Sequence, residues 1–519
     1  MVQKSPRAVS TAPSSSSSPQ GMDRFFKITS RGSTLAREFR GGLVTFFSMA
    51  YIIALNPIII GTTADKNGNL ISGLPLYAEW PPVYDEAGQM ITETLGANIG
   101  MTMTMVAAAT AVIAGVMSLL MGLIGRYPIA IAAGLGLNAF VAYGIAPMMT
   151  WGQAMGLIVW EGIIITILVL TKFRKAVMNA VPHSLRTAIS VGIGLFIALI
   201  GLVDAGFVRQ GSQMGELGIG GTIAGWPLLV FVIVLVGLVI MWVHRVKGAM
   251  LIAIVAGTIL AVIVEAVAKV GDSMANPSTG WRLNVPQLAE GGSWLPNLEL
   301  LKFWNHIDLI GAFSADFKAW IVVIMLILAL MLADFFDTMG TIVAIGKTGN
   351  LLQKDGNPPR TQQILLVDSL AAVAGGLFST SSNTSYIESA SGVSDGARTG
   401  LASIVTGLTF LVAVFITPLV NLVPSEAVAP VLVVVGFLML QQVTDIDWKD
   451  LEVAIPAFFM ITMMPFTYSI TVGMGLGFII YLIIKLVQGK ASKTSPLLWV
   501  IGVMFLIYFM QGLILNWLS

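Results

Sequence analysis

Two aspartates lie three residues apart inside a long apolar stretch in the second half of the chain. The stretch 319–346 is almost wholly apolar apart from Asp334 and Asp337. Residues at positions i and i+3 share one face of a helix. An acid at the centre of a membrane helix costs roughly 2.5 to 3.5 kcal/mol on insertion scales, so such residues persist where they face a polar interior. We interpret both as lining a substrate or proton path; hydrogen bonding to a neighbouring helix is the structural alternative.

A second polar stretch follows at residues 379–389, with the sequence Ser-Thr-Ser-Ser-Asn-Thr-Ser-Tyr-Ile-Glu-Ser. The order of apolar segments places it at membrane depth, where it cannot face lipid. Hydroxyl side chains compete for backbone hydrogen bonds and favour caps and turns. We therefore expect a broken helix whose N-terminal amides face a cavity, with Glu388 at a site lined with donors. A salt bridge from Glu388 to Arg398, or a helix cap, is the structural alternative.

Three further polar residues are weaker candidates. Asn138 lies in a short Gly-rich segment and offers a donor and an acceptor, which suits the edge of a heterocycle; an interhelical hydrogen bond is its structural alternative. Glu161 and Asp368 fall in apolar stretches, but each is near enough to a segment end to lie at the membrane interface.

The polar side chains of these motifs indicate the kind of ligand. A carboxylate accepts two N–H donors in a plane, and an amide offers one donor and one acceptor, which fits the edge of a nucleobase. No Arg or Lys lies in the motifs, so an inorganic anion lacks a fixed counter-charge, although half-helix N-termini supply part of one. Residue chemistry alone indicates a neutral or cationic polar solute.

The composition is that of a helical membrane protein. Of 519 residues, 56% are hydrophobic and only 11% charged, with a mean hydropathy of +0.86. Long continuous apolar runs exclude the alternating pattern of a membrane β-barrel. A net charge of +1 does not suggest nucleic acid as a partner, and with no cysteine and three scattered histidines we expect no metal site and no cofactor.

About fourteen apolar segments precede residue 485. Longer ones start near Gly41, Met103, Leu157, Thr187, Trp226, Gly248, Ala319, Gly400, Ala427 and Thr471, and shorter ones cover residues 129–143, 365–378, 383–394 and 453–465. A further apolar segment, residues 497–518, either crosses the membrane or lies in the interface.

The segments divide into two similar halves. Fourteen is seven plus seven, and an odd-numbered repeat comes out inverted in the membrane. Residues 114–138 form a span, a short link and a truncated segment of small residues, and residues 374–395 repeat that order. Short, Gly-interrupted segments at corresponding positions of two halves point to a transporter's binding site; close helix packing is the plainer explanation.

The basic residues predict the orientation. The chain before Gly41 carries seven Lys or Arg against two acids, whereas residues 62–100 carry one Lys against five acids. By the excess of positive charge on cytoplasmic loops, the N-terminus is expected inside. The Ser run at residues 14–18 favours a disordered cytoplasmic tail over a signal peptide.

Five motifs in order resemble a known family. They are GLVTFFSMAYIIALNP (42–57), GLGLNAF (134–140), DFFDTMG (334–340), TSYIES (384–389) and MPFTYSI (464–470). Together they resemble the AzgA-like adenine, guanine and hypoxanthine permeases, a branch of the nucleobase and cation symporters within the xanthine and uracil permease superfamily. The resemblance runs from about Arg37 to Lys490; the long loops 62–100 and 270–319 depart from it.

This resemblance implies the uracil-permease fold, an all-α polytopic membrane protein. Its fourteen segments form a seven-plus-seven inverted repeat divided into core and gate domains, and the third and tenth are half-helices preceded by short strands. The expected division is a disordered tail 1–36, core 37–183 and gate 184–270 of the first repeat, extracellular loop 271–318, core 319–421 and gate 422–490 of the second repeat, and a hydrophobic segment 491–519.

The resemblance also implies how the site works. The substrate-site asparagine of the family falls on Asn138, its eighth-segment acids on Asp334 and Asp337, and its tenth-segment glutamate on Glu388. A purine nucleobase moves with a proton by elevator-like displacement of core against gate, often as a dimer in the cell membrane. The residues that we expect to bind substrate are Asn138, Phe140, Asp334, Phe336, Thr384 and Glu388, with Phe336 or Phe140 as an aromatic face. Those that we expect to couple the proton are Asp334, Asp337 and Glu388.

Three alternatives stay open from the sequence. The same fold could carry uracil, xanthine or an inorganic anion. Paired aspartates also serve membrane-embedded hydrolases, although two acids on one helix without a partner motif on another favour no enzyme and no catalytic residue. A passive channel differs by failing to concentrate its substrate.

Overall fold

The computed structural model describes residues 20–83, 92–171, 181–210, 217–219, 223, 225–273, 279–287, 295–302, 306–313, 317–353 and 357–518. This part of the chain is mostly helical and polytopic. Ten helical stretches are long and apolar enough to cross a membrane. They are Leu35–Ile60, Gly96–Gly125, Trp151–Leu170, His183–Asp204, Trp226–Val243, Ala249–Ala268, Trp320–Gly349, Gly400–Leu422, Ser425–Asp445 and Ile470–Val487.

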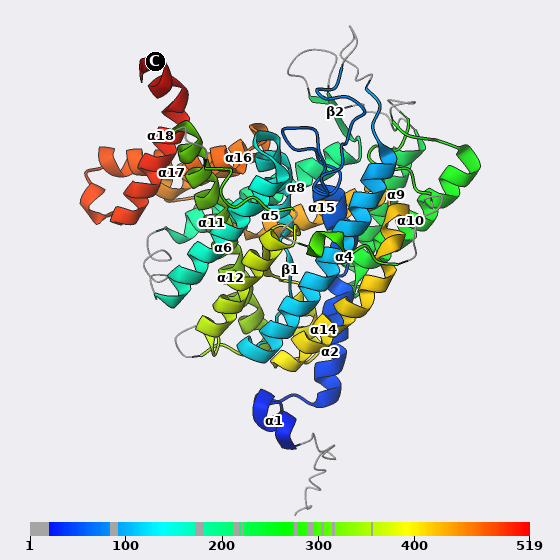
Figure 1. Cartoon of the computed structure of the whole chain (residues 1–519). Helices are drawn as coiled ribbons and strands as arrows, with labels where there is room; N and C mark the ends of the chain where they lie inside the picture. The colour runs from blue at the N-terminus through cyan, green and yellow to red at the C-terminus, as the bar shows by residue number, and fades with distance from the viewer. Residues whose placement is uncertain are drawn as a thin grey trace, which may run out of the picture.

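These stretches contain the main helices, drawn in Figure 1. The helices of the ten stretches are α2 (Leu35–Met49), α3 (Ile52–Ile60), α4 (Gly96–Leu120), α6 (Trp151–Leu170), α8 (His183–Asp204), α9 (Trp226–Val243), α10 (Ala249–Ala268), α11 (Phe317–Gly349), α14 (Gly400–Ala413), α15 (Ser425–Leu440) and α17 (Ile470–Val487). Outside them lie α5 (Leu135–Ala139), α12 (Thr361–Leu377), α13 (Ser389–Ser394), α16 (Leu451–Phe466) and α18 (Pro496–Leu518). The count of fourteen crossings stays a prediction.

Two apolar segments are broken at the same place by a short antiparallel pair of strands. Strand β1 (Ile131–Ala133) pairs with β4 (Asn383–Ser385), and Ala132 is opposite Thr384. Helix α5 follows β1, and α13 follows β4 after three residues. The strands satisfy each other's backbone groups inside the protein, which lipid cannot do. This is the arrangement that the resemblance implies for the third and tenth segments; a second pair, β2 (Val208–Gln210) with β3 (Leu217–Ile219), lies in a connection between spans.

The helices around this strand pair come from both halves of the chain. Helix α14 packs on α2 and α4, and α12 packs on α6. A second group joins α8 to α15 and α16, with α9 and α10 against α15. In Figure 1, α9 and α10 lie on one side of the molecule and α16 to α18 on the opposite side. Only 33% and 28% of the apolar windows of α9 and α10 are buried, against 83% in Leu35–Ile60, so the former lie at the periphery of the bundle and protein surrounds the latter.

The prediction of a disordered tail over residues 1–36 is wrong for residues 20–36; residues 1–19 lie outside the described part. Helix α1 (Gln20–Phe26) and a 3-10 turn (Thr29–Arg31) precede α2. The Arg31 guanidinium donates to the carbonyls of Arg126 and Arg398, at 3.0 and 3.1 Å, and the Arg126 guanidinium lies 3.7 Å from the ring centroid of Phe25. These contacts hold the segment against the helix bundle.

Part of the connection predicted as an extracellular loop, residues 271–318, packs beside the start of α15. The backbone N–H of Arg282 donates to Glu426 over 2.9 Å, and the Asn284 amide donates to the carbonyls of Asn421 and Val423. At the other end of the chain, α18 packs on α17 and α11.

Candidate functional site

The two motifs singled out from the sequence meet where α11 passes β4. Asp334 lies in α11 and is 1% exposed, and neither of its carboxyl oxygens accepts a hydrogen bond within the described residues. The Thr384 hydroxyl of β4 is beside this carboxyl, although not in standard hydrogen-bond geometry. A buried carboxyl without donors is unfavourable unless it is neutral or a ligand supplies them. Asp334 therefore offers two acceptor oxygens to a ligand with N–H groups.

Asp368, a weak candidate in the sequence, belongs to the same cluster. It lies at the middle of α12 and is 3% exposed. Its oxygens accept hydrogen bonds from Thr338 and Ser385, each over 2.7 Å. The Thr338 hydroxyl is also 2.6 Å from that of Thr384. Asp368 thus joins α12 to α11 and β4 next to Asp334.

Glu161 is the third buried acid of this cluster. It is fully buried in the middle of α6 rather than at a helix end. One of its oxygens accepts a weak hydrogen bond of 3.4 Å from Ser382, and the other has no partner within the described residues. Asp334 is close enough to interact electrostatically with both Asp368 and Glu161. Three carboxyls therefore share one interior region.

Asn138 presents a free oxygen in the partner segment. Its amide nitrogen donates to the side-chain oxygen of Asn56 over 2.7 Å, while its own oxygen has no partner within the described residues. Asn56 donates in turn to the Thr110 hydroxyl (2.8 Å) and the Thr380 carbonyl (3.2 Å). The interhelical hydrogen bond, the structural alternative, is therefore present, and it leaves the acceptor of Asn138 available. Asn56 was missed as a site residue, although its Asn-Pro pair interrupts an apolar run.

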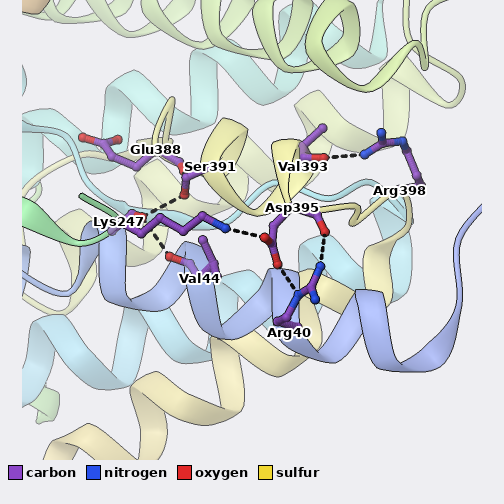
Figure 2. A network of polar contacts seen from close by, with 9 residues as sticks. Arg40, Val44, Lys247, Glu388, Ser391, Val393, Asp395 and Arg398 are labelled. Carbon is purple, nitrogen blue, oxygen red and sulfur yellow. Dashed lines mark hydrogen bonds and ion pairs between the residues drawn. The ribbon is translucent and has the colours of Figure 1, made fainter. Parts of the chain in front are cut away.

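Glu388 lies between β4 and α13 and is bound by a residue that sequence reasoning missed. The Tyr51 hydroxyl, at the break between α2 and α3, donates to Glu388 over 2.5 Å. Figure 2 shows Glu388 and Arg398 at opposite ends of α13, and Arg398 donates instead to the carbonyls of Val393 and Ala397. The side chain of Glu388 does not cap α13. The salt bridge and the cap, its two structural alternatives, are both wrong.

The two acids of α11 face different neighbours. Asp337 is half-buried and within electrostatic range of Asp368 and Glu388, whereas Asp334 interacts with Asp368 and Glu161. Asp368 thus interacts with both aspartates of α11, while Glu161 interacts with Asp334 and Glu388 with Asp337.

The predicted aromatic residues are buried at different places. Phe336 is 9% exposed and lies 5.9 Å from the Arg186 guanidinium of α8, with its ring centroid 5.7 Å from that of Phe335. Phe140 is 1% exposed at the end of α5, with its ring over Gly144. Phe336 thus connects α11 to α8, and Phe140 stays on the Asn138 segment.

Most of the chain is similar to known permeases. The model of the Permease family matches residues 89–476. The chain is 36% identical to the guanine/hypoxanthine permease PbuG of Bacillus subtilis (strain 168), over 94% of this chain and 99% of that one. It is 32% identical to the adenine permease AdeP of Escherichia coli (strain K12), over 94% and 96%. The chain belongs to the Permease family. The resemblance drawn from the five motifs is thereby confirmed.

The fold of this permease also occurs in a more distant transporter. The transmembrane domain of a cyanobacterium bicarbonate transporter, BicA, matches with a TM-score of 0.53 at 17% identity, over 85% of this chain and 97% of that one. At that identity the similarity concerns the fold alone.

At the end of α13, this permease has an ionic contact that the motifs did not indicate. Asp395 accepts hydrogen bonds from Arg40 of α2 and from Lys247, which lies between α9 and α10 (Figure 2). Partial burial acts to raise the pKa of Asp395, but the hydrogen bonds from Lys247 and Arg40 outweigh it and the pKa is lowered. The end of the broken segment is thus fastened both to α2 and to the connection between α9 and α10.

Proposed function

We propose that this permease is a secondary active transporter that imports a purine nucleobase, such as adenine, guanine or hypoxanthine, together with a proton. One observation carries the proposal: three buried acceptor oxygens, two on Asp334 and one on Asn138, have no donor within the described residues. The edges of purine nucleobases carry N–H donors that match them. The names of the similar permeases, for guanine/hypoxanthine and for adenine, support the same substrate class.

In this proposal each polar group has its own role in binding the purine. Asp334 and Glu388 accept N–H donors of the purine, and Asn138 completes the polar edge. Thr384 borders the site from β4, and Phe336 or Phe140 supplies an aromatic face. Protonation of Asp334, Asp337 or Glu388 accompanies substrate entry, since a site of lower net charge crosses a low-dielectric interior at lower cost.

We further propose that transport uses fourteen segments in a seven-plus-seven inverted repeat. The paired β1 and β4, each followed by a short helix, support two related halves. The core comprises residues 37–183 and 319–421, the gate residues 184–270 and 422–490, and the core moves against the gate as an elevator. The contacts of α8 with α15 and α16 support a separate gate group.

The proposal also covers the membrane location, orientation and assembly of the protein. We place it in the cell membrane with a cytoplasmic N-terminus, supported by the seven basic residues before Gly41. A dimer is the proposed assembly. The similar proteins are named permeases, which supports transport without catalysis.

The second candidate is the same fold with another cargo, such as uracil or xanthine. Competition separates the two: unlabelled adenine, guanine and hypoxanthine should reduce labelled hypoxanthine uptake, whereas uracil and xanthine should not. Stronger inhibition by uracil or xanthine than by adenine, guanine or hypoxanthine would favour this second candidate.

The decisive experiment is uptake of radiolabelled hypoxanthine into bacterial cells that lack other purine permeases. We expect accumulation against the gradient, collapse on adding a protonophore, and loss of uptake in Asp334→Asn and Glu388→Gln. Asp447→Asn and Glu79→Gln make the same chemical changes at exposed residues outside the site and should transport normally. Uptake that survives both the protonophore and Glu388→Gln would exclude proton symport by this site.

A further inference from the structure

Four buried side chains form a line from α12 to the proposed substrate site. Asp368 accepts from Thr338 over 2.7 Å, and Thr338 is 2.6 Å from Thr384, which borders Asp334. The four are between 1% and 3% exposed. The line therefore connects two carboxyls through two hydroxyls and excludes bulk water.

The number of hydrogen-bond donors in this line allows two arrangements of its hydrogen bonds. A hydroxyl donates one hydrogen bond and accepts others. When Asp368 is ionised, Thr338 donates to it, Thr384 donates to Thr338, and nothing is left to donate to Asp334. This agrees with the two unpartnered oxygens of Asp334.

When Asp368 carries a proton, the line can run in the opposite direction. The Asp368 carboxyl donates to Thr338, Thr338 donates to Thr384, and Thr384 donates to Asp334. Each hydroxyl rotates and keeps its own hydrogen, so the proton remains on Asp368. Asp334 then gains one donor as a carboxylate and keeps its other oxygen for the ligand.

We propose that Asp368 binds the coupled proton and that Thr338 and Thr384 transmit its protonation state to Asp334 by reversing their hydrogen bonds. The inference rests on the proposed proton symport and assigns the proton to a residue outside Asp334, Asp337 and Glu388. Proton binding at Asp368 then raises purine affinity at Asp334. Because coupling between two binding sites is reciprocal, purine binding favours the proton equally.

The surroundings of Asp368 favour a shared proton. Glu161 faces the cluster from α6, and Asp334 and Asp337 face it from α11. The other elements packed on α12, namely α4, β1, β4 and the π-helix at residues 121–125, contain no Lys or Arg. Four neighbouring carboxyls disfavour full ionisation of the cluster, which supports a proton site among them.

Ser385 supplies an internal comparison. It donates to the other oxygen of Asp368, over 2.7 Å, and has no connection through Thr338 to Asp334. Removing the Ser385 hydroxyl changes the environment of Asp368 but leaves the hydrogen bonds that run from Asp368 through Thr338 to Thr384. Replacing Thr384 cuts the line and leaves both contacts of Asp368 in place.

The test measures hypoxanthine dissociation constants of the purified full-length permease between about pH 5.5 and 8.5, with proton-driven uptake in proteoliposomes. For the unaltered protein, affinity should fall as pH rises. In Asp368→Asn the amide donates permanently to Thr338, so binding should be tight and independent of pH, and a proton gradient should no longer drive accumulation. Thr384→Val should bind about tenfold more weakly at low pH, with no pH dependence, because a hydrogen bond to a charged group is lost.

Three further variants serve as controls. Thr384→Ser keeps the hydroxyl and should restore the pH dependence. Ser385→Ala should shift its midpoint without abolishing it. Thr417→Val makes the same change at a buried threonine that bonds only within its own helix region, to Val414, and should behave like the unaltered protein.

The outcomes distinguish this inference from the function on which it rests. If the unaltered protein binds no purine at any pH, the proposed function fails. If it binds and accumulates hypoxanthine with protons, and Asp368→Asn and Thr384→Val keep the same pH dependence, the function stands and this inference is overturned. If Asp368→Asn does not fold, as judged by thermal unfolding, the Thr384→Val and Thr384→Ser pair decides alone.

Discussion

The side-chain amide of Asn138 donates to the side-chain oxygen of Asn56, 82 positions earlier in the chain, over 2.7 Å. Asn56 is fully buried and donates to Thr110 and Thr380, so its own orientation is determined. The contact occupies the side-chain nitrogen of Asn138 and leaves its side-chain oxygen without a partner within the described residues. Asn56 is thus a positioning residue for the Asn138 acceptor.

Replacing Asn56 with alanine should therefore weaken substrate binding more than it slows transport. The change leaves the Asn138 nitrogen and the Thr380 carbonyl without partners, at about 1 to 3 kcal/mol per buried group. We expect a KM for hypoxanthine raised about tenfold or more, with a smaller change in maximal rate, and a lower Tm. Asn98→Ala removes an exposed amide that bonds Pro75 and should leave KM unchanged. An Asn56→Ala protein with unaltered KM would show that Asn138 needs no such support.

Tyr51→Phe should reduce substrate affinity through Glu388. The hydroxyl of Tyr51 is its only difference from phenylalanine, and it donates to Glu388 over 2.5 Å. A hydrogen bond to a charged group contributes about 1.5 to 3 kcal/mol, so KM should rise by about tenfold or more while the protein stays folded. The measurement is initial-rate uptake of labelled hypoxanthine at matched protein levels. Tyr481→Phe, on α17, is the matched control; an equal effect of both changes would argue against a role for the Tyr51 hydroxyl.

Part of this site could be predicted from the sequence because placing an acidic side chain in lipid is unfavourable in free energy. Asp334 and Asp337 interrupt a stretch that is otherwise apolar, and Glu388 lies in the polar stretch that follows it. Asp334 is buried, whereas Asp337 and Glu388 are half-buried. Hydropathy does not tell how deep a residue lies, so Asp368 was a weak candidate although it touches two elements of the site. The partner of Glu388 was not predictable, because Tyr51 is 337 positions away and only the packed fold brings them together.

The fold, too, could be predicted from the sequence only in part. Long apolar runs predicted the spans, and Gly-rich or hydroxyl-rich interruptions predicted the two broken segments. The register of β1 with β4, which places Thr384 opposite Ala132, depends on contacts between the two halves. The ordered segment at residues 20–36 depends on Arg31 reaching carbonyls of distant loops. The low-complexity sequence directly before residue 20 does not indicate the contacts of Arg31.

Arg31→Ala should release the segment before α2. The guanidinium donates two hydrogen bonds, to the Arg126 and Arg398 carbonyls, and their loss should lower the free energy of unfolding by about 1 to 2 kcal/mol. We expect faster proteolytic cleavage near residues 20–33 and a lower Tm. Arg24→Ala, in α1, provides the control. Equal cleavage rates for the Arg31→Ala and unaltered proteins would show that the tail is held by other contacts.

Lys247→Ala should alter the transport rate rather than substrate affinity. Lys247 and Asp395 join the connection between α9 and α10 to the end of α13, and an elevator movement of core against gate must break or shift this contact. Because Lys247 is largely exposed, the stability lost should be below about 1 kcal/mol. We expect an unchanged KM and a changed maximal rate in uptake assays. Lys247→Arg keeps the positive charge beside Asp395 and should retain the maximal rate of the unaltered protein.

The pH dependence of this contact has a definite sign. The pKa of Asp395 is lowered in the folded protein, so its ion pairs stabilise the fold above the ordinary carboxyl value of about 4, and this contribution is lost as pH falls through the lowered pKa. The Tm difference between the unaltered protein and Lys247→Ala should therefore be constant from neutral pH to about pH 4 and vanish below it. A difference that grew on acidification would mean that Lys247 stabilises the permease through some contact other than Asp395.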